Sequence, residues 1–147
     1  MKKPILMIFN VLTVALLLSS CAKDNSNNPV YLSANISGMN WSANSISAGS
    51  DTCTGYTAIE ADNSDGSLFY LNFPTDASGN YGVSSGGDCS IQYIDPQGDL
   101  YDIQGGSIAI NSPLFSGTNG SFDGVGINDA NSQDQINISG GSFHVNS

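Results

Sequence analysis

The sequence predicts an all-β fold in which antiparallel strands form a β-sandwich or a small barrel. Three observations favour this class. Beyond residue 29 no segment keeps a 3.6-residue apolar period, whereas several segments alternate apolar and polar residues with period two. Gly, Ser and Asn are abundant and are typical of tight turns. Glu60 is the only glutamate of the chain, so strong helix formers are scarce.

The first element is an export leader at residues 1–20. Lys2 and Lys3 give it a positive start, residues 5–18 form its apolar stretch, and Leu18-Ser-Ser-Cys21 follows directly. This ending resembles a bacterial lipobox, which implies cleavage before Cys21 and acylation of that cysteine with palmitate-type chains. The fourteen residues of this stretch, which include Asn10 and Thr13, reach about 21 Å as a helix, too short for a hydrocarbon core of about 30 Å. The resemblance therefore predicts a lipid anchor in the outer membrane and leaves the leaflet open.

Residues 21–29 follow as the lipidated Cys21 and a flexible tether, since they show no apolar periodicity. A single antiparallel domain is expected over 30–147. Removal of Lys2 and Lys3 with the leader leaves Lys23 as the only cation against thirteen carboxylates, a side-chain charge of −12. Nucleic acids and nucleotides are excluded as partners, because binding their phosphates requires clustered Lys or Arg.

Nine strands are expected within this domain, each bounded by Gly, Asn, Asp or Pro. Their ranges are 30–36, 41–47, 56–62, 68–73, 90–94, 100–103, 107–111, 120–127 and 135–145. Short turns between consecutive strands predict a meander. Alternation assigns the following side chains to the core: Phe69, Leu71, Phe73, Ile108, Ile110, Val125, Ile127, Ile136 and Ile138.

The cysteines predict one disulfide. With Cys21 assigned to lipid, Cys53 and Cys89 remain as a pair in an oxidising compartment, and the closed loop would contribute about 3.5 to 4 kcal/mol of stability in the chain-entropy model. A transition-metal site or a cysteine nucleophile is not expected, because His144 is the only histidine and no C-x-x-C motif occurs.

A calcium site is a weak alternative to an ordinary turn at residues 60–66. Asp62, Asn63 and Asp65 offer oxygen ligands two residues apart, as Ca²⁺ prefers. The EF-hand template fails, however, because Ala61 stands at its first ligand position and Asn72 at its twelfth. We therefore expect a turn, no metal and no other cofactor.

An enzyme is not expected. The sequence contains no nucleophile elbow, Walker loop or dinucleotide fingerprint. Two suitably spaced carboxylates could support glycan hydrolysis, but nothing selects a pair. Trp41 and Tyr81 are the candidate ligand-contact aromatics, since aromatic faces beside Asn and Asp suit sugar hydroxyls. The alternative is that they pack in the core or across strands.

Five short motifs, in a fixed order, are the basis of a resemblance to a known family. These are Gly38-Met-Asn-Trp41-Ser-Ala43, Gly79-Asn-Tyr81, Gly106-Ser-Ile108-Ala-Ile110, Gly120-Ser-Phe122 and the closing segment 136–145. In this order they resemble a small lipoprotein domain of unknown function that is common in Bacteroidota. The resemblance implies an all-β extracytoplasmic domain and transfers no catalytic residue.

These observations predict a binding or structural module of the cell envelope, held at the outer membrane through Cys21. A glycan and an envelope protein are the candidate partners. The alternatives are a carboxylate-based glycan hydrolase, and a carrier of apolar ligands if the barrel encloses a cavity. The ligand and the oligomeric state are not encoded in any motif.

Overall fold

The computed structural model describes residues 29–51, 55–74, 78–84, 87, 89–112 and 117–146. All regular structure in these residues is β. Ten strands follow one another along the chain: β1 (Tyr31–Ile36), β2 (Met39–Ser42), β3 (Ser45–Asp51), β4 (Tyr56–Asp62), β5 (Leu68–Pro74), β6 (Gly79–Val83), β7 (Ser90–Ile94), β8 (Leu100–Ser112), β9 (Thr118–Asn128) and β10 (Gln135–Val145). The predicted all-β class is confirmed.

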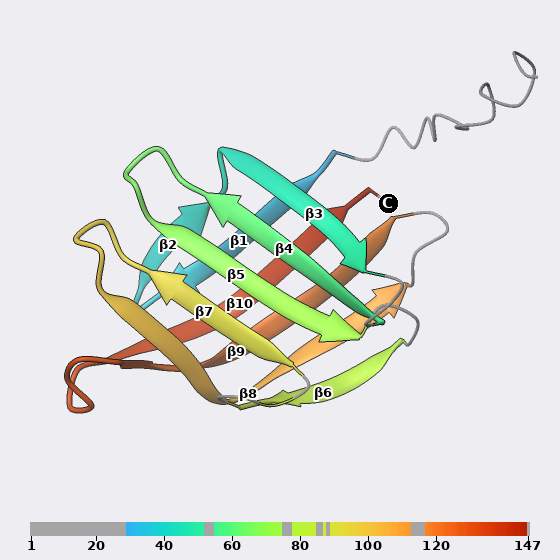
Figure 1. The fold of residues 1–147 in the computed structure, drawn as a ribbon. Coiled ribbons are helices and arrows are strands. Elements are labelled where there is room, and N and C mark those ends of the chain that lie inside the picture. The colour runs from blue at the N-terminus through green and yellow to red at the C-terminus, as the bar shows by residue number, and fades with distance from the viewer. Residues whose placement is uncertain are drawn as a thin grey trace, which may run out of the picture.

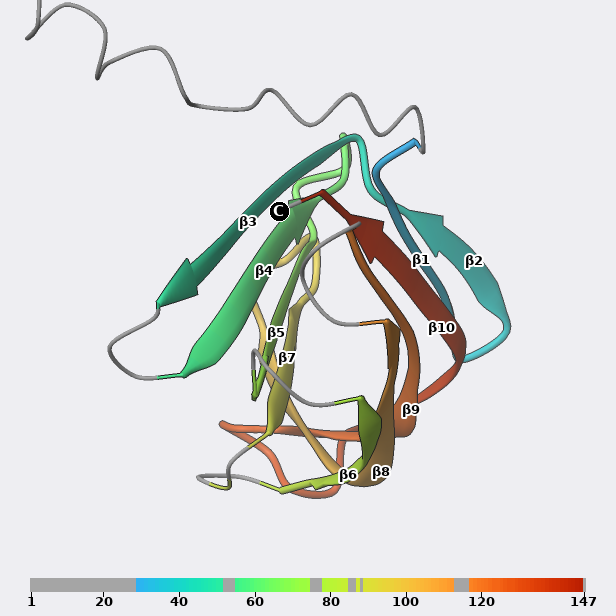
Figure 2. The same cartoon turned by 90° about the vertical axis from the view of Figure 1, so that its right-hand side faces the viewer.

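The strands form one antiparallel sheet with the order β2-β1-β10-β9-β8-β7-β5-β4-β3, and β6 pairs with β8 beside this path. The expected meander accounts for β3 to β5 and for β7 to β10. The β1–β2 hairpin, in contrast, joins the sheet at β10. The sheet curls into a half-barrel, so that a wall of β3, β4, β5 and β7 faces a wall of β2, β1, β10 and β9 (Figures 1 and 2).

The two edges of the sheet meet at a corner between β2 and β3. The Ala43 N–H donates to the Leu32 carbonyl of β1 at 2.9 Å, and the next N–H, of Asn44, donates to the Asp62 carbonyl of β4 at 2.7 Å. One expected strand over 41–47 is therefore two strands on opposite edges. The prediction was wrong here because it ran one strand through Asn44 and Ser45, two consecutive polar residues at which the apolar alternation changes phase.

The strand β8 is long and pairs with β9 on one side and with two successive strands on the other. Its first half pairs with β7 and its second half with β6, the short strand that the sequence did not predict. The two expected strands at 100–103 and 107–111 are joined through a bulge at Gly105 and Gly106. A Cβ at Gly106 would lie 1.9 Å from the Asp123 carbonyl oxygen of β9. Only glycine allows β8 and β9 to approach this closely.

Large apolar side chains fill the space between the walls. Phe69 lies in the middle of this core, with ring centroids 4.9 Å from Trp41, 4.9 Å from Tyr93 and 5.6 Å from Phe122. Phe73 packs on Phe143 at 5.4 Å. Burial of each such ring stabilises the fold by about 1.5 to 3 kcal/mol. The predicted inward positions on β5 and in the second half of β8 are confirmed.

The predicted orientation of β9 is wrong. Val125 is 38% exposed and Ile127 only partly buried, whereas the intervening positions face the core. The Phe122 side chain points into the core, and glycines occupy the next positions on the same side of β9. A Cβ at Gly126 would lie 2.6 Å from the Ile136 side chain. Small residues on β9 therefore make room for large residues of its neighbours, which outweighs the burial of Val125.

Candidate functional site

Cys21 and Cys53, the predicted anchor and half of the predicted disulfide, lie outside the described residues. Cys89 is described: it lies just before β7, is 1% exposed, and its carbonyl accepts the Ser84 N–H at 3.5 Å. Pairing of Cys53 with Cys89 stays a prediction.

The strand register shows to which end of the wall Cys89 belongs. Asp51, the last residue of β3, is opposite Tyr56, the first residue of β4. In the next pairs across the wall, Thr57 is opposite Phe73 and Ser90 is opposite Asn72. Cys89 precedes Ser90, so it belongs to the end of this wall where β3 ends and β4 begins.

Trp41 is a core residue and not an exposed platform for a ligand. It is 5% exposed, and its indole Nε1 donates to the Ser67 hydroxyl at 2.7 Å. Its ring lies edge-on to Phe69. Because β2 turns the Trp41 ring inward, the ring is not open for a ligand to stack on. Trp41 still contributes to the lining of a hollow beside β1 and β2, so a ligand contact at this residue stays a prediction. Tyr81 is half-buried on β6 and packs against the core.

The turn after β4 uses its polar side chains to cap itself. Asn63 Oδ1 accepts the Asp65 N–H at 3.3 Å, and Asn63 Nδ2 donates to the Ser42 carbonyl at 3.0 Å. Asp65 Oδ1 accepts both the N–H and the hydroxyl of Ser67. These bonds from Ser67 hold the pKa of the Asp65 carboxyl below its usual value of 3.8. Two of the three candidate calcium ligands, Asn63 and Asp65, therefore already form side-chain hydrogen bonds within an ordinary turn.

Acidic residues elsewhere are dispersed. In the described ranges, no three His, Cys, Asp or Glu side chains gather closely enough to hold a metal ion. Tyr101 and Asn128 both donate to Asp134 Oδ2, at 2.9 and 3.2 Å, and Gln92 donates to Asp102 Oδ1 at 2.8 Å. These carboxylates hold loops and neighbouring strands together.

The outer side of the second wall, over β2, β1, β10 and β9 and the end of β8, carries a different set of side chains. We call it the neutral face and define it by the side chains that line two hollows there. The polar ones are Tyr31, Ser33, Asn35, Asn40, Ser42, Asn111, Asn119, Ser121, Ser139, Ser142 and His144, and the apolar ones are Pro29, Ala34, Trp41 and Phe143. None is a carboxylate, lysine or arginine, although residues 30–147 contain twelve carboxylates. Period-two alternation predicts only that these polar positions lie on the side of the strands away from the core.

The larger hollow, of about 450 Å³, lies beside Tyr31 and includes Pro29, Asn119, Ser121 and His144 in its lining. Tyr31 is opposite His144 in the register, is 44% exposed, and its ring is nearly parallel to the imidazole, with centroids 6.2 Å apart. Its phenol ring is thus partly open to solvent, as a stacking surface requires.

The His144 imidazole packs against the Tyr31 ring on the protein side. The imidazole is 7% exposed, and within the described residues its Nε2 has no hydrogen-bond partner. Gly117, with φ of +93°, lies against the ring: a Cβ there would be 2.9 Å from Cε1. The imidazole is therefore enclosed, and Tyr31 is the aromatic side chain that the hollow presents to solvent.

The smaller hollow, of about 370 Å³, lies further along β1 and includes Asn35, Asn40 and Ser139 in its lining. Asn35 Nδ2 donates to Asn40 Oδ1 at 3.2 Å, and Asn35 Oδ1 accepts the Gly38 N–H at 2.8 Å. Each amide group offers two donors and an acceptor oxygen with two lone pairs. The pair is therefore held in place while keeping capacity for a hydroxyl-bearing ligand.

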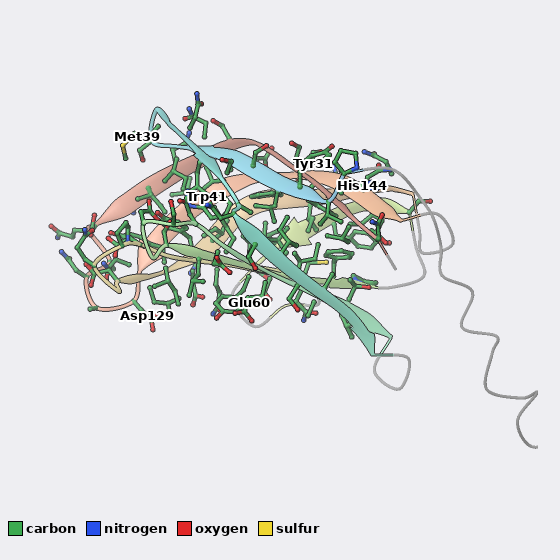
Figure 3. All side chains as sticks on the ribbon, turned by 90° about the horizontal axis from the view of Figure 1, so that it is seen from above. Tyr31, Met39, Trp41, Glu60, Asp129 and His144 are labelled. Atoms are coloured by element: carbon green, nitrogen blue, oxygen red, sulfur yellow. The ribbon has the colours of Figure 1, made fainter. Side chains whose placement is uncertain are left out.

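The hollows are neighbours on one surface, because Ser33 and Ser142 form a hydroxyl pair at 3.2 Å between them. Figure 3 shows Tyr31 and His144 together on this side, Glu60 on the opposite side and Asp129 at one end. Glu60 and Asp129 thus lie away from the two hollows, whereas Asp123, exposed on β9 two residues after Ser121, is a carboxylate on the same side of that strand. The neutral face is the candidate binding site.

Comparison with protein-family models, with curated proteins and with solved structures gives no match to this chain. No helix capable of crossing a bilayer occurs in the part of the chain that the structure describes.

Proposed function

We propose that this chain is a lipoprotein, anchored through Cys21 in the outer membrane, whose β domain is a binding module and not a catalyst. The observation that carries the anchor is the leader: a positive start, a short apolar stretch and Leu-Ser-Ser-Cys in the right order. The resemblance to small Bacteroidota lipoprotein domains supports the same location.

The charge of the domain also supports a covalent anchor. Residues 30–147 contain no lysine or arginine. A protein surface without cations is repelled by anionic lipid headgroups and gains nothing from them. Membrane attachment must then come from acyl chains, for which each buried methylene contributes about 0.8 kcal/mol.

Binding is supported by where the polar hollows and the carboxylates lie. The interior is occupied by the Phe69 cluster, which favours a surface ligand over an apolar ligand carried inside. Glycan hydrolysis needs two carboxylates flanking the bond, and neither hollow of the neutral face has one. A ligand on this face would therefore be bound without being cleaved.

Metabolic labelling of the full chain with an alkyne fatty acid in a lipoprotein-processing bacterium tests the anchor. We expect label and membrane association in the wild type and in Cys53→Ser, and loss of both in Cys21→Ser. Cys53→Ser is the matched control because it also removes one thiol. Label retained in Cys21→Ser, or absent from the wild type, would overturn the proposed anchor.

A further inference from the structure

We infer that the neutral face binds an uncharged polysaccharide chain, stacked on Tyr31 and extending along β1 toward Asn35 and Asn40. This inference rests on the proposed function, because it names the ligand class of the proposed binding module. It depends on three features of the face: its charge, its side-chain chemistry and its length.

The absence of charge on the neutral face selects the class of ligand. The domain is strongly acidic, so anionic polymers such as uronic-acid polysaccharides and nucleic acids are repelled at long range. Cationic ligands would be drawn to the carboxylates outside the hollows, such as Glu60 on the opposite wall, Asp129 at one end (Figure 3) and Asp123 on β9. A neutral ligand is affected by neither field and can occupy the two hollows, whose lining residues include no carboxylate.

The side chains of the face match sugar hydroxyls. Asparagine and serine both donate and accept hydrogen bonds, as each hydroxyl of a sugar does. The apolar face of a sugar ring packs on an aromatic ring, and Tyr31 is partly exposed above the enclosed His144. Tyr31 is held in place by its cross-strand neighbour, so less side-chain freedom is lost on binding.

The length of the face favours a chain of sugars over a single sugar. Tyr31 and Asn35 are four residues apart on β1, about 13 Å along the strand. The Ser33–Ser142 pair lies between the hollows. A ligand that fills both hollows must therefore span several units.

The position of the larger hollow places such a ligand close to the lipid anchor. Pro29 contributes to its lining, and Pro29 is the eighth residue after Cys21. A fully extended chain of that length reaches at most about 28 Å. The polysaccharide would be held near the membrane surface.

Affinity electrophoresis of the detergent-solubilised full chain tests this site. The native gels contain a neutral β-glucan, α-mannan or galactan, and polygalacturonate serves as the charged counterpart. We expect retardation by at least one neutral polymer and none by polygalacturonate. Soluble oligosaccharides of the retained polymer should compete better as they lengthen. Retardation by no neutral polymer, or by polygalacturonate alone, would overturn the inference.

Amino-acid substitutions test whether the polysaccharide binds at the neutral face. Tyr31→Ala should weaken retention about three- to tenfold, the loss typical of one aromatic contact, whereas Tyr31→Phe should retain it. Tyr70→Ala, half-buried on β5 of the opposite wall, is the matched control. Ser121→Gln, at an exposed position, should block the larger hollow without affecting the core, and so gives a second measurement if Tyr31→Ala does not fold.

Equal effects of Tyr31→Ala and Tyr70→Ala, or unchanged retention in Ser121→Gln, would place the ligand elsewhere and overturn the site. The anchor test is independent of these results. If fatty-acid labelling depends on Cys21 but the glycan test fails, only the proposed polysaccharide site is refuted. If labelling does not depend on Cys21, the proposed anchor is refuted.

Discussion

Replacing Ser67 with alanine tests whether the buried network around Trp41 stabilises the fold. Ser67 is 0% exposed, accepts the Trp41 indole N–H at 2.7 Å and donates to Asp65. In Ser67→Ala the indole N–H is buried without an acceptor, which costs about 1 to 3 kcal/mol. Urea denaturation at pH 7 should show this loss, a large fraction of a total stability of about 5 to 15 kcal/mol.

A double-mutant cycle with Trp41→Phe separates the hydrogen bond from other effects. Phenylalanine has no N–H, so in that background Ser67→Ala leaves no indole donor unsatisfied. The cost of Ser67→Ala should then be smaller by about 1 kcal/mol or more. If the two losses add to within about 0.5 kcal/mol, the reasoning from the network is refuted.

The hydroxyl of Ser67 also lowers the pKa of the Asp65 carboxyl. Because the pKa of this carboxyl is lowered in the folded state, its contribution to stability is present above pH 3.8 and is lost as the pH falls through the folded-state value. Ser67→Ala keeps the backbone N–H but removes the hydroxyl, so the Asp65 pKa should rise toward 3.8. Carbon-detected NMR titration measures it, and an unchanged pKa would contradict the role of the hydroxyl.

Three further predictions follow from the packing and from the sequence. Gly106→Ala should lower the free energy of unfolding by about 1 to 3 kcal/mol or more, because its Cβ would lie 1.9 Å from a carbonyl oxygen. Gly82 has open space around it, so Gly82→Ala should leave the free energy of unfolding unchanged or raise it by up to about 1 kcal/mol. Equal effects of the two variants in urea denaturation would contradict this. Thiol titration of denatured, unreduced protein matured in the periplasm should find Cys53 and Cys89 unreactive, and two reactive thiols would exclude their disulfide. Burial raises the pKa of the Tyr93 phenol, so its contribution to stability is present below pH 10.0 and is lost as the pH rises through the folded-state value; Tyr93→Phe should reduce the loss of stability above pH 10.0 in alkaline unfolding, and an identical pH profile would contradict it.

Much of the fold was predictable because its strands follow local rules. The strands β4, β7 and β10 begin and end at the predicted residues, since apolar alternation there is bounded by turn residues on both sides. The short strand β6 was missed because its sequence, Gly-Asn-Tyr-Gly-Val, has low β propensity and is held by its pairing with β8. Pairing partners are not encoded in local alternation.

The candidate site was less predictable than the fold. A count of aromatic residues indicated Trp41, but only the tertiary structure shows that its N–H is used by Ser67. Tyr31 gave no stronger signal than the other tyrosines. The available signal was the repeated Ser or Asn at alternate positions of β1 and β2, which becomes informative once β9 and β10 extend it into one surface.

The neutral face depends on a bulge in β10 at the glycine pair Gly140-Gly141, where the sequence already indicates an interruption of the strand. Between Ile138 and Gly141, β10 has one residue more than each of its neighbours β1 and β9. Strict alternation from Ile138 would turn His144 inward and Phe143 outward, because a shift of one residue exchanges the two sides of a strand. Gly140, with φ of +58°, accommodates the extra residue, and a Cβ at Gly141 would lie 2.5 Å from a carbonyl of β9. The glycine pair therefore brings Phe143 into the core and His144 under Tyr31 in the same step, so the stability of the domain and the shape of its candidate site depend on the same two residues.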